Sequence, residues 1–365
     1  MLNEKTIAVV VPAYNEEKQI HQVLKSIPEF VDRIVVVDDC SIDKTSSVVV
    51  NYMNEVTDRD LVDIKIADTA VEKTDYNYAD QIAEKIRLDE ESLYVPSKIV
   101  ENGTSRIIFI SHQVNSGVGS AISSGYKWCR DHRIDCTAVM AGDGQMDPAE
   151  LESICEPIAS GKVSYVKGNR LIHKAATVVI PKTRFLGNSI LSILTKIASG
   201  YWHVSDTQTG FTAISLEALE GIQLHKIYRG YGVPNDILVK LNIGFFRIME
   251  IPIKPIYNVG EQSKMKIWKV IPKIFFLLIS SFFERLFMKY FLRNFHPLFI
   301  CYLMFFITFI FDILLFSKLL FDLIVIHRVN DNYLITAVFT SMLTVQFLLF
   351  GMWFDMQDNE RLYIE

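Results

Sequence analysis

Two long apolar runs near the C-terminus constrain the fold of this chain more than any other feature of its sequence. Residues 298–326 and 334–354 are almost continuously apolar. Each run exceeds the roughly 18 residues that mark a membrane-spanning helix. We therefore expect two spans, over about 298–317 and 334–354, within a membrane domain of residues 297–365. Half of all residues are hydrophobic, but the excess is concentrated here, and the upstream part has the composition of a soluble domain.

The residues before the first run predict how the chain meets the membrane. Residues 268–295 mix aromatic and basic side chains. This composition is typical of helices that lie in a membrane interface, so we assign 265–296 to interfacial helices. By the positive-inside rule, the basic residues place this side in the cytoplasm. Two spans return the chain to the same side, which predicts a multi-pass protein of the cell membrane with its N-terminal domain and both termini cytoplasmic.

Asp312 falls inside the first apolar run. An acidic side chain at membrane depth should face protein rather than lipid. We expect the span itself to end near Phe316, which leaves Lys318 and Asp322 near the interface.

Residues 1–264 alternate between short apolar runs and helical patterns. This alternation is the signature of a parallel, doubly wound α/β sheet with helices on its faces. Strands are expected over 6–11, 33–37, 106–110, 136–140 and 163–167, and helices over 16–27, 41–50, 117–128 and 148–158.

Residues 51–103 are long for a connection between a helix and the next strand. The segment is acidic, contains Tyr76, Tyr78 and Tyr94, and is compatible with a helix over 79–88. We interpret it as a surface insertion. A solvated excursion and a regulatory or partner-binding segment are both open for it.

Charge and cysteine usage exclude some classes of protein. A formal charge of −5 predicts no general attraction to nucleic acid. The five cysteines show neither a CxxC spacing nor a paired pattern, which indicates reduced thiols in a cytosolic compartment. The first residues lead straight into a predicted strand, so we expect no signal peptide. The oligomeric state stays open, with a homo-oligomer among the alternatives.

Polar turns follow the predicted strands where each strand ends. Residues 12–16 follow the first strand, Asp38 and Asp39 follow the second, and residues 141–148 follow a later one. Open α/β sheets bind ligands at the C-terminal ends of their strands, so these turns are candidates for one site. The glycine-bearing turn at 115–121 opens a helix, where it suits either an anion or close packing.

The turn at 141–148 carries side-chain oxygens at every second residue, on Asp143, Gln145 and Asp147. Such a cluster can hold Mg²⁺ or Mn²⁺ together with a diphosphate. The alternative is an ordinary turn after a strand. Because Asp147 and Pro148 suit a helix start, we expect Asp147 to cap the next helix rather than to bind metal.

Taken together, these turns resemble the family 2 glycosyltransferases with the GT-A fold, and more closely the membrane-anchored dolichol-phosphate mannose synthase branch. The resemblance covers about residues 6–264 and then the two-span tail. Several motifs in order are far more specific than any one alone. They are Val11-Pro-Ala-Tyr-Asn-Glu16, Val37-Asp-Asp39, Asn115-x-Gly-x-Gly119, Gly142-Asp-Gly-Gln145 and Asp206-x-Gln-Thr-Gly-Phe211.

The resemblance implies a role for each matching residue. Asp39 would contact the base, and Asp143 and Gln145 would bind the metal. The expected catalytic residues are Asp143, Arg170, Asp236 and Lys264. The nucleotide-sugar site would comprise Pro12, Ala13, Tyr14, Glu16, Asp38, Asp39, Asn115, Gly117, Ala141, Gly142 and Asp143. The sugar and acceptor side would comprise Arg170, Asp206, Gln208, Thr209, Asn235, Ser263 and Lys264.

The chain departs from the family pattern in three places. Ala141 stands where the usual motif has its first acid, Tyr257-Asn258 occupies a region where relatives often carry an arginine, and the insertion at 51–103 is not typical. Mg²⁺ commonly uses only one or two carboxylates plus phosphate, so Asp143 with Gln145 is compatible with metal binding.

The resemblance implies a metal-dependent, inverting transfer of a monosaccharide to a polyprenyl or dolichyl phosphate. The donor would be GDP-mannose, UDP-glucose or UDP-N-acetylglucosamine. A processive polysaccharide synthase would need a Gln-x-x-Arg-Trp signature and usually more spans, and neither is present. A non-catalytic, membrane-anchored nucleotide-binding protein is supported by Ala141, but Asp39, Asp143, Gln145 and Arg170 argue against it.

Overall fold

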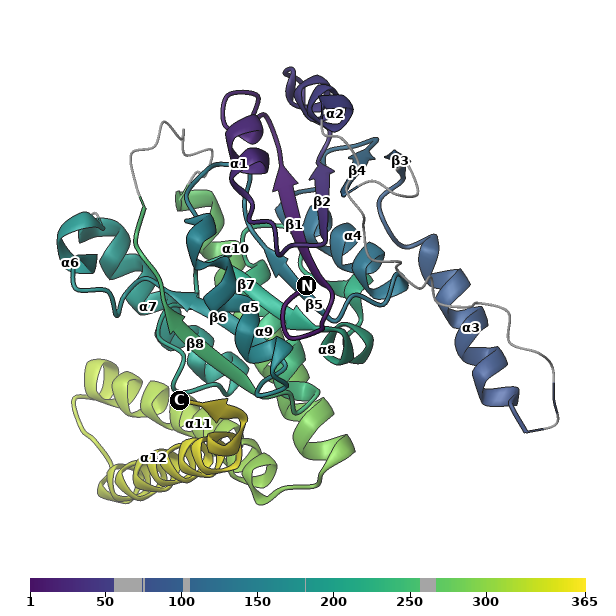
Figure 1. Ribbon diagram of the computed structural model, residues 1–365. Coiled ribbons are helices and arrows are strands. Elements are labelled where there is room, and N and C mark those ends of the chain that lie inside the picture. Colours follow the sequence, from purple (N-terminus) through teal and green to yellow (C-terminus); the bar gives the residue numbers. More distant parts are fainter. Residues whose placement is uncertain (56–73, 75, 101–105, 181, 257–266) are drawn as a thin grey trace.

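The computed structural model describes residues 1–55, 74, 76–100, 106–180, 182–256 and 267–365. A nine-stranded sheet forms the centre of the N-terminal domain, in the order β3-β4-β2-β1-β5-β7-β6-β8-β9 (Figure 1). The strands are β1 (Ile7–Ala13), β2 (Arg33–Asp38), β3 (Ser97–Val100), β4 (Ile107–His112), β5 (Cys136–Val139), β6 (Tyr165–Asn169), β7 (Thr212–Ser215), β8 (Ile248–Pro252) and β9 (Tyr363–Ile364).

The sheet is mixed, with a parallel centre. Strands β4, β2, β1 and β5 are parallel neighbours, as the alternation of strands and helices predicts. However, β7 runs antiparallel to both β5 and β6, and β3 runs antiparallel to β4. The sheet is thus mostly parallel, and the two strands that reverse direction, β3 and β7, are not among those expected from the sequence. A short apolar run identifies a buried strand but carries no information on its direction, which the path of the chain decides.

Helices cover both faces of the sheet. Successive residues of a strand point to opposite faces. Val10 and Val37 pack in one cluster with residues of α4 and α9, whereas Val9 and Val36 pack in another with residues of α1 and α5. The domain therefore has three layers. Its helices are α1 (Ile20–Ser26), α2 (Thr45–Glu55), α3 (Tyr78–Glu91), α4 (Val118–Asp131), α5 (Leu151–Ala159), α6 (Ala176–Val179), α7 (Lys182–Ser199), α8 (Leu216–Gly221) and α9 (Val233–Ile243).

Two helices begin later than their patterns predict. The expected helices over 16–27 and 41–50 start instead at Ile20 and Thr45. Asp43 Oδ1 accepts a hydrogen bond from the backbone N–H of Thr45 at 3.0 Å, which satisfies a donor of the first turn. The residues before each helix are thus left in the turns that follow β1 and β2.

The insertion at 51–103 contains the expected helix, which is α3. None of its side chains is buried along its length. Its C-terminal end is attached to the domain, because Glu90 pairs with Arg130 at 3.3 Å and contacts His225 at 2.5 Å. β3 follows and extends the sheet beside β4. The described residues of the segment therefore form a surface addition, and residues 56–73, 75 and 101–103 lie outside the described part.

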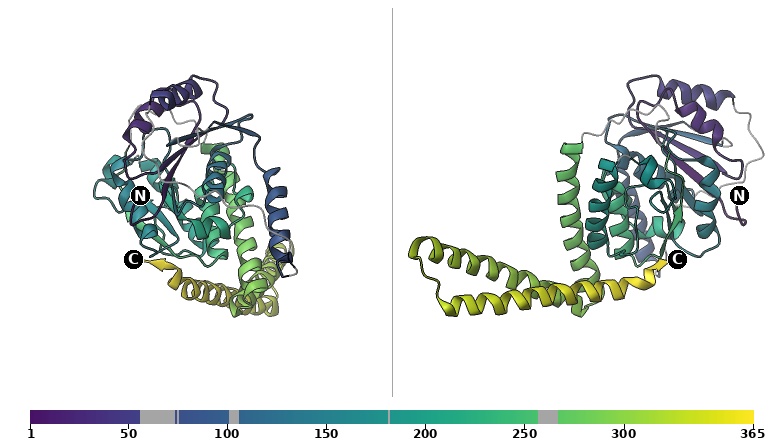
Figure 2. Two further views of the ribbon diagram at one scale, coloured as in Figure 1. Left: turned by 45° about the vertical axis from the view of Figure 1, so that its right-hand side comes forward. Right: turned by 90° about the vertical axis from the view of Figure 1, so that its left-hand side faces the viewer.

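Three long helices follow the N-terminal domain, and two of them could span a membrane. Figure 2 shows α11 and α12 projecting from the domain as a hairpin, crosswise to α10. The candidate spans are Pro297–Ile326 and Asp331–Leu362, with hydropathies of 2.6 and 1.9. The first helix continues past Phe316, where we expected the span to end. The helices are α10 (Ile267–Phe287), α11 (Pro297–Phe321) and α12 (Asp331–Asn359), with π-helical turns at Met288–Arg293 and Asp322–Ile326.

Asp312, which falls inside the first candidate span, faces protein, as expected for an acidic side chain there. Asp312 is buried between the two hairpin helices, and Thr344 Oγ1 donates to its Oδ2 at 2.6 Å. After α12 the chain returns to the N-terminal domain, where β9 pairs in parallel with β8. The chain end and the N-terminal domain therefore lie at the same end of the hairpin.

Candidate active site

The polar turns that follow β1, β2 and β5 meet at one edge of the sheet. The backbone N–H of Asp39 donates to Ala13 O at 2.9 Å, and that of Gly142 donates to Pro12 O at 3.2 Å. Parallel neighbours end at the same edge, so three segments far apart in the sequence become adjacent. The expected nucleotide-sugar residues of these turns, including Tyr14, Glu16 and Ala141, thus lie on neighbouring strand ends.

Asp39 organises the glycine-bearing turn that precedes α4. Its carboxylate accepts hydrogen bonds from the backbone N–H groups of Ser116 (3.0 Å) and Gly117 (2.7 Å). Its Oδ1 also lies 2.8 Å from Nδ1 of His112, whose Nε2 lies 2.9 Å from Ser124 Oγ. Burial alone would raise the pKa of Asp39, but these hydrogen bonds outweigh it and hold the pKa below its ordinary value. The residue therefore positions the turn that contains Asn115 and Gly117.

Asp38 is also buried and holds its own turn. Its Oδ1 accepts from the backbone N–H and the hydroxyl of Ser41, and its Oδ2 accepts from Ser46 Oγ. Ser41 Oγ in turn accepts the N–H of Asn15 at 2.9 Å, which joins the turns after β1 and β2. Asp38 and Asp39 thus hold the turns on either side of the site by accepting backbone hydrogen bonds.

The glycine-bearing turn packs tightly against the loop before α9. Gly117 has φ of +94°, a conformation that L side chains rarely adopt. A Cβ on Gly119 would lie 1.9 Å from Tyr228 O and 2.3 Å from Val233 Cγ2. The N–H of Gly119 already donates to Arg229 O at 2.8 Å. Close packing is therefore one function of these glycines.

Gly119→Ala should destabilise the fold by roughly 1–3 kcal/mol or more, because the added methyl group has no room beside Tyr228 O. Thermal unfolding of the detergent-solubilised protein measures this effect. Gly187→Ala in α7 is the matched control, since nothing lies within 4 Å of its Cβ position and alanine favours a helix. Equal melting temperatures for Gly119→Ala and the parent would contradict the packing role.

The turn after β5 presents Asp143 and Gln145. Asp143 is half-buried, and its Oδ1 accepts the backbone N–H of Gln145 at 3.0 Å, across Gly144 with φ of +74°. Asp147 accepts the N–H of Ala149 at 3.0 Å, which confirms that it caps the following helix. Lys254 Nζ also pairs with Asp147 at 2.8 Å, and this hydrogen bond holds the pKa of Asp147 below its ordinary value.

The donor set at this turn fits a divalent cation that arrives with a diphosphate. One carboxylate and one side-chain amide offer hard oxygen ligands, which suit Mg²⁺ or Mn²⁺. Within the described ranges no group of three or more His, Cys, Asp or Glu side chains could hold a metal on its own. Phosphate oxygens would have to complete the coordination of any cation here.

Arg170 and Asp206 form a buried, bidentate ion pair beside this turn. Arg170 Nε lies 2.8 Å from Asp206 Oδ2, and Nη2 lies 3.0 Å from Oδ1. Asp206 is 1% exposed, whereas the Arg170 side chain keeps 20% of its surface exposed. Burial would raise the pKa of Asp206, but the hydrogen bonds and charge of Arg170 hold it below its ordinary value. Asp206 therefore orients Arg170 from the protein interior.

Two further charged residues, which none of the sequence motifs contains, support this pair. Glu250 on β8 accepts the backbone N–H groups of Ser205 (2.9 Å) and Asp206 (3.0 Å). Burial raises its pKa. Lys167 on β6 is fully buried and donates to Thr209 O at 2.5 Å, and burial lowers its pKa to about 8. Burying a charged side chain in a strand is costly unless it is paired. A Lys or Glu within a predicted buried strand is therefore a sequence signal of a functional or structural role, and Lys167 and Glu250 both carry it.

Three of the residues expected on the sugar and acceptor side, Gln208, Thr209 and Asn235, lie between α7, α9 and the 206–209 turn. Gln208 Nε2 donates to Asn235 Oδ1 at 2.9 Å, and Thr195 Oγ1 of α7 donates to the same oxygen at 3.2 Å. Asn235 is fully buried, and its Nδ2 has no hydrogen-bond partner among the described residues. Such a donor is a candidate for a ligand oxygen.

Asp236 is held inside the protein. It accepts the N–H of Tyr228 at 2.8 Å and pairs with Lys240 Nζ at 2.6 Å. It therefore fixes the loop that packs on Gly117 and Gly119. Ser263 and Lys264, the expected phosphate ligands, lie outside the described residues.

Comparisons with known proteins show what the chain as a whole is similar to. The glycosyl transferase family 2 model matches residues 8–66 and 92–222, more than half of the chain. The UDP-N-acetylglucosamine–dolichyl-phosphate N-acetylglucosaminyltransferase of Methanococcus voltae is 29% identical over 282 residues, which cover 76% of this chain and 96% of that protein. A dolichyl-phosphate beta-glucosyltransferase of Trichomonas vaginalis is 25% identical over 294 residues, covering 76% and 74%.

A shorter match and a solved structure accompany these. The undecaprenyl-phosphate mannosyltransferase of Micrococcus luteus is 27% identical over 150 residues, which cover 41% of this chain and 60% of that protein. Among solved structures, glucosyl-3-phosphoglycerate synthase from Mycobacterium tuberculosis in complex with UDP superposes with a TM-score of 0.47 at 17% identity, over 77% of this chain and 80% of that one.

Proposed function

The chain belongs to glycosyl transferase family 2, and from this premise we propose that it transfers one sugar from a nucleotide-sugar to a polyprenyl phosphate at a membrane surface. Relatives named for transfer to dolichyl or undecaprenyl phosphate support this substrate class. The observation that carries the proposal is the placement of α10, which joins the acceptor side of the site to the two candidate membrane helices.

One face of α10 packs on the N-terminal domain and the other is apolar and exposed. Ile274 and Leu278 are buried against Ala198 of α7, and α10 also packs along α9. The opposite face exposes large apolar side chains, which suits a helix lying in a bilayer interface. These are Ile271, Phe275, Phe276, Ile279, Phe283 and Phe287. Asn235 lies in the first turn of α9, and α9 packs against α10. An α10 that lies in the bilayer interface would therefore bring the acceptor side close to the lipid surface.

The acceptor needs little chemical activation. The second pKa of a phosphate is about 6, so a polyprenyl phosphate is largely ionised near pH 7. Its oxygen can attack the sugar C1 directly, from the face opposite the departing diphosphate, which inverts that carbon. The tasks of the protein are then to align the two substrates and to stabilise charge on the nucleoside diphosphate.

The residues at the C-terminal edge of the sheet would divide these tasks. Asp143 and Gln145 would hold a Mg²⁺ or Mn²⁺ ion, which supplies Lewis-acid stabilisation of the diphosphate. Arg170, oriented by Asp206, would add positive charge beside the donor or acceptor phosphate. Asn235 Nδ2 would donate to a sugar or acceptor oxygen, and Lys264 would engage phosphate.

The hairpin geometry supports a particular topology. The chain end pairs with β8, so the C-terminus lies with the N-terminal domain at one end of the hairpin. By the positive-inside rule, the basic residues before α11 favour the cytoplasmic side for this end. Donor and acceptor would meet at the cytoplasmic face.

The transfer assay identifies both donor and metal. Purified full-length protein is incubated with dolichyl or undecaprenyl phosphate and, separately, labelled UDP-N-acetylglucosamine, UDP-glucose or GDP-mannose. We expect one donor to yield an organic-soluble, lipid-linked monosaccharide, because a single site aligns one sugar. EDTA should abolish the product, and added Mg²⁺ or Mn²⁺ should restore it, since Asp143 and Gln145 fit a cation bound with the diphosphate.

The other outcomes separate the alternatives. A long polymer would identify a processive synthase. Complete absence of product with every donor and acceptor would support a non-catalytic nucleotide-binding protein. Full activity in EDTA, after the protein has been stripped of metal, would refute the metal assignment alone.

A further inference from the structure

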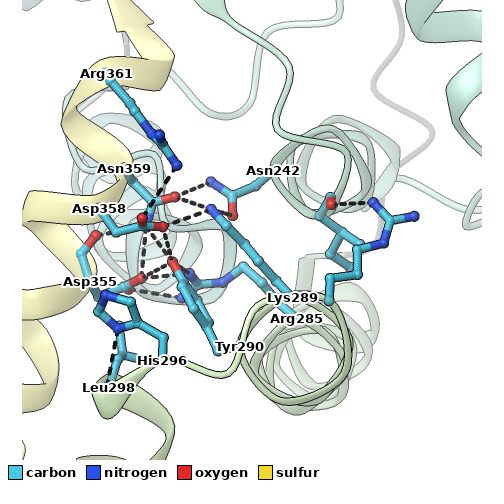
Figure 3. A network of polar contacts seen from close by, with 12 residues as sticks. Asn242, Arg285, Lys289, Tyr290, His296, Leu298, Asp355, Asp358, Asn359 and Arg361 are labelled. Atoms are coloured by element: carbon cyan, nitrogen blue, oxygen red, sulfur yellow. Dashed lines mark hydrogen bonds and ion pairs between the residues drawn. The ribbon is translucent and has the colours of Figure 1, made fainter.

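A buried polar network joins the membrane hairpin to the N-terminal domain (Figure 3). Arg285, Lys289 and Tyr290, on α10 and the turn after it, meet Asp355 and Asn359 near the end of α12. All five side chains are at most 2% exposed. Buried charges are retained only when they are paired and hydrogen-bonded, so this network is a specific construction rather than a surface contact.

The network holds the C-terminal end of α7. Arg285 pairs with both oxygens of Asp355, at 2.6 and 2.8 Å. The same guanidinium donates to the carbonyls of Ala198 (2.9 Å) and Ile197 (3.0 Å), which belong to the last turn of α7. A cation there satisfies orphan carbonyls and interacts favourably with the helix dipole. Gly200 leaves the necessary room, since a Cβ on it would lie 2.5 Å from Arg285 Nη1.

The network also holds the end of α9. Lys289 Nζ donates to Asn242 Oδ1 at 3.0 Å and to Asn359 Oδ1 at 2.6 Å. Asn242 Nδ2 donates to the same Asn359 oxygen at 2.7 Å. Arg293 Nη1 donates to Ile243 O, the last residue of α9, at 2.8 Å. Asn359 of α12, together with Lys289 and Arg293 of the turn after α10, thus contacts α9 directly.

Both helices lead from this network to the acceptor side. Thr195 of α7 and Asn235 of α9 are hydrogen-bonded to each other at 3.2 Å, beside Gln208. The donor turns after β1, β2 and β5 are held by other contacts, through Asp38, Asp39 and Gly142. A shift of α12 would therefore move the acceptor side relative to the donor side.

Apolar packing alone would be enough to attach α10. Ile274 and Leu278 already bury against Ala198, and Leu286, Tyr290, Leu298 and Tyr302 form a second apolar cluster. Replacing a buried ion pair by apolar residues is often neutral for stability, so an anchor needs no charges. Hydrogen bonds are directional, whereas apolar packing is not. The network therefore fixes the position of α12 relative to the ends of α7 and α9.

We propose that Asp355 and Asn359 are positioning residues for acceptor binding, which act through Arg285 and Lys289 on α7 and α9. The membrane hairpin would then be part of the acceptor site as well as an anchor. This inference rests on the proposed transfer to a polyprenyl phosphate. It gives the hairpin a role in acceptor binding in addition to its role as a membrane anchor.

The test compares acceptor and donor parameters in full-length variants. Asp355→Asn keeps the side-chain volume and removes the charge, and Asn242→Leu breaks the link from the domain side. In lipid nanodiscs, the KM for dolichyl phosphate should rise at least tenfold for each variant. The Kd of the donor nucleotide, measured by titration calorimetry with UDP or GDP, should stay within twofold. An unchanged acceptor KM, or a parallel loss of nucleotide affinity, would overturn the inference.

Hydrogen–deuterium exchange tests the coupling without any activity. Amides at 235–238, in the first turn of α9, should exchange faster in both variants although the substitutions lie at other positions. Unchanged exchange there would also overturn the inference. If the parent transfers no sugar to any acceptor, the proposed function fails, whereas the exchange result still decides whether α12 is coupled to α9.

A matched control separates this role from a general effect on the C-terminal segment. Arg361 lies close to Asn359 in the chain, but its side chain is 66% exposed and pairs loosely with Asp358 at 3.5 Å. Arg361→Ala should leave acceptor KM, nucleotide Kd and exchange at 235–238 as in the parent. If Asp355→Asn fails to fold, Asn242→Leu carries the same comparison from the domain side.

Discussion

Asp143→Ala is expected to lower kcat about a thousandfold, which corresponds to roughly 4 kcal/mol of lost transition-state stabilisation. Asp143 is the carboxylate on the turn after β5 that can contribute to a cation beside the diphosphate, and Ala141 offers no second one. The steady-state rate of lipid-linked sugar formation gives kcat. Mn²⁺ binding in the presence of UDP or GDP, followed by electron paramagnetic resonance, should weaken in parallel.

Asp147→Asn is the matched control for this prediction. Asp147 lies four residues away but caps a helix and pairs with Lys254. We expect activity within a few-fold of the parent and a loss of stability of about 1 kcal/mol or less, because asparagine also caps helices. Full activity of Asp143→Ala, with Mn²⁺ binding retained, would refute the metal site.

Arg170→Ala is expected to destabilise the protein by about 3–5 kcal/mol, because it leaves Asp206 buried without its bidentate partner. Transfer activity should fall as well, since a cation beside the donor site is lost. Arg170→Lys should recover only part of both, because an ammonium cannot reproduce the planar two-pronged contact. Chemical unfolding monitored by tryptophan fluorescence gives the stability, and the transfer assay gives the rate.

Arg133→Ala serves as the comparison for this second prediction. Its guanidinium lies 3.8 Å from Glu220, and both side chains are at least half exposed. Exposed pairs contribute about 0–1 kcal/mol, so this substitution should hardly change the unfolding curve. An equally small change in unfolding free energy for Arg170→Ala would show that the Arg170–Asp206 pair does not stabilise the fold.

The strand ends of the site could be predicted from sequence because the evidence for them is local. A buried apolar run followed by polar residues marks a strand end, and parallel strands share one edge, so the turns holding Asp39 and Asp143 could be placed together. The capping role of Asp147 was equally local, since it depends on the N–H of Ala149 two residues away.

The partners of each charged side chain could not be predicted in the same way. Asp39 and Asp236 match residues that the resemblance assigns to ligands, yet their carboxylates are engaged by His112 and Lys240 within the fold. Lys167 and Glu250, which the motifs do not include, support the 206–209 turn from neighbouring strands. Asp236 and Lys240 are four residues apart on one helix, but the contacts of Asp39, Lys167 and Glu250 join residues tens of positions apart, and no local pattern encodes those.

The sequence by itself determined the family, the α/β character of the N-terminal domain and the two apolar helices, because periodicity, turn residues and apolar length are properties of short segments. Only the tertiary structure decided that β7 runs antiparallel, and that Arg285 and Lys289 meet Asp355 and Asn359 in a buried network. The physical reason is the same in both cases. Strand direction and buried charge pairing depend on where distant segments pack, and burial makes those choices energetically decisive.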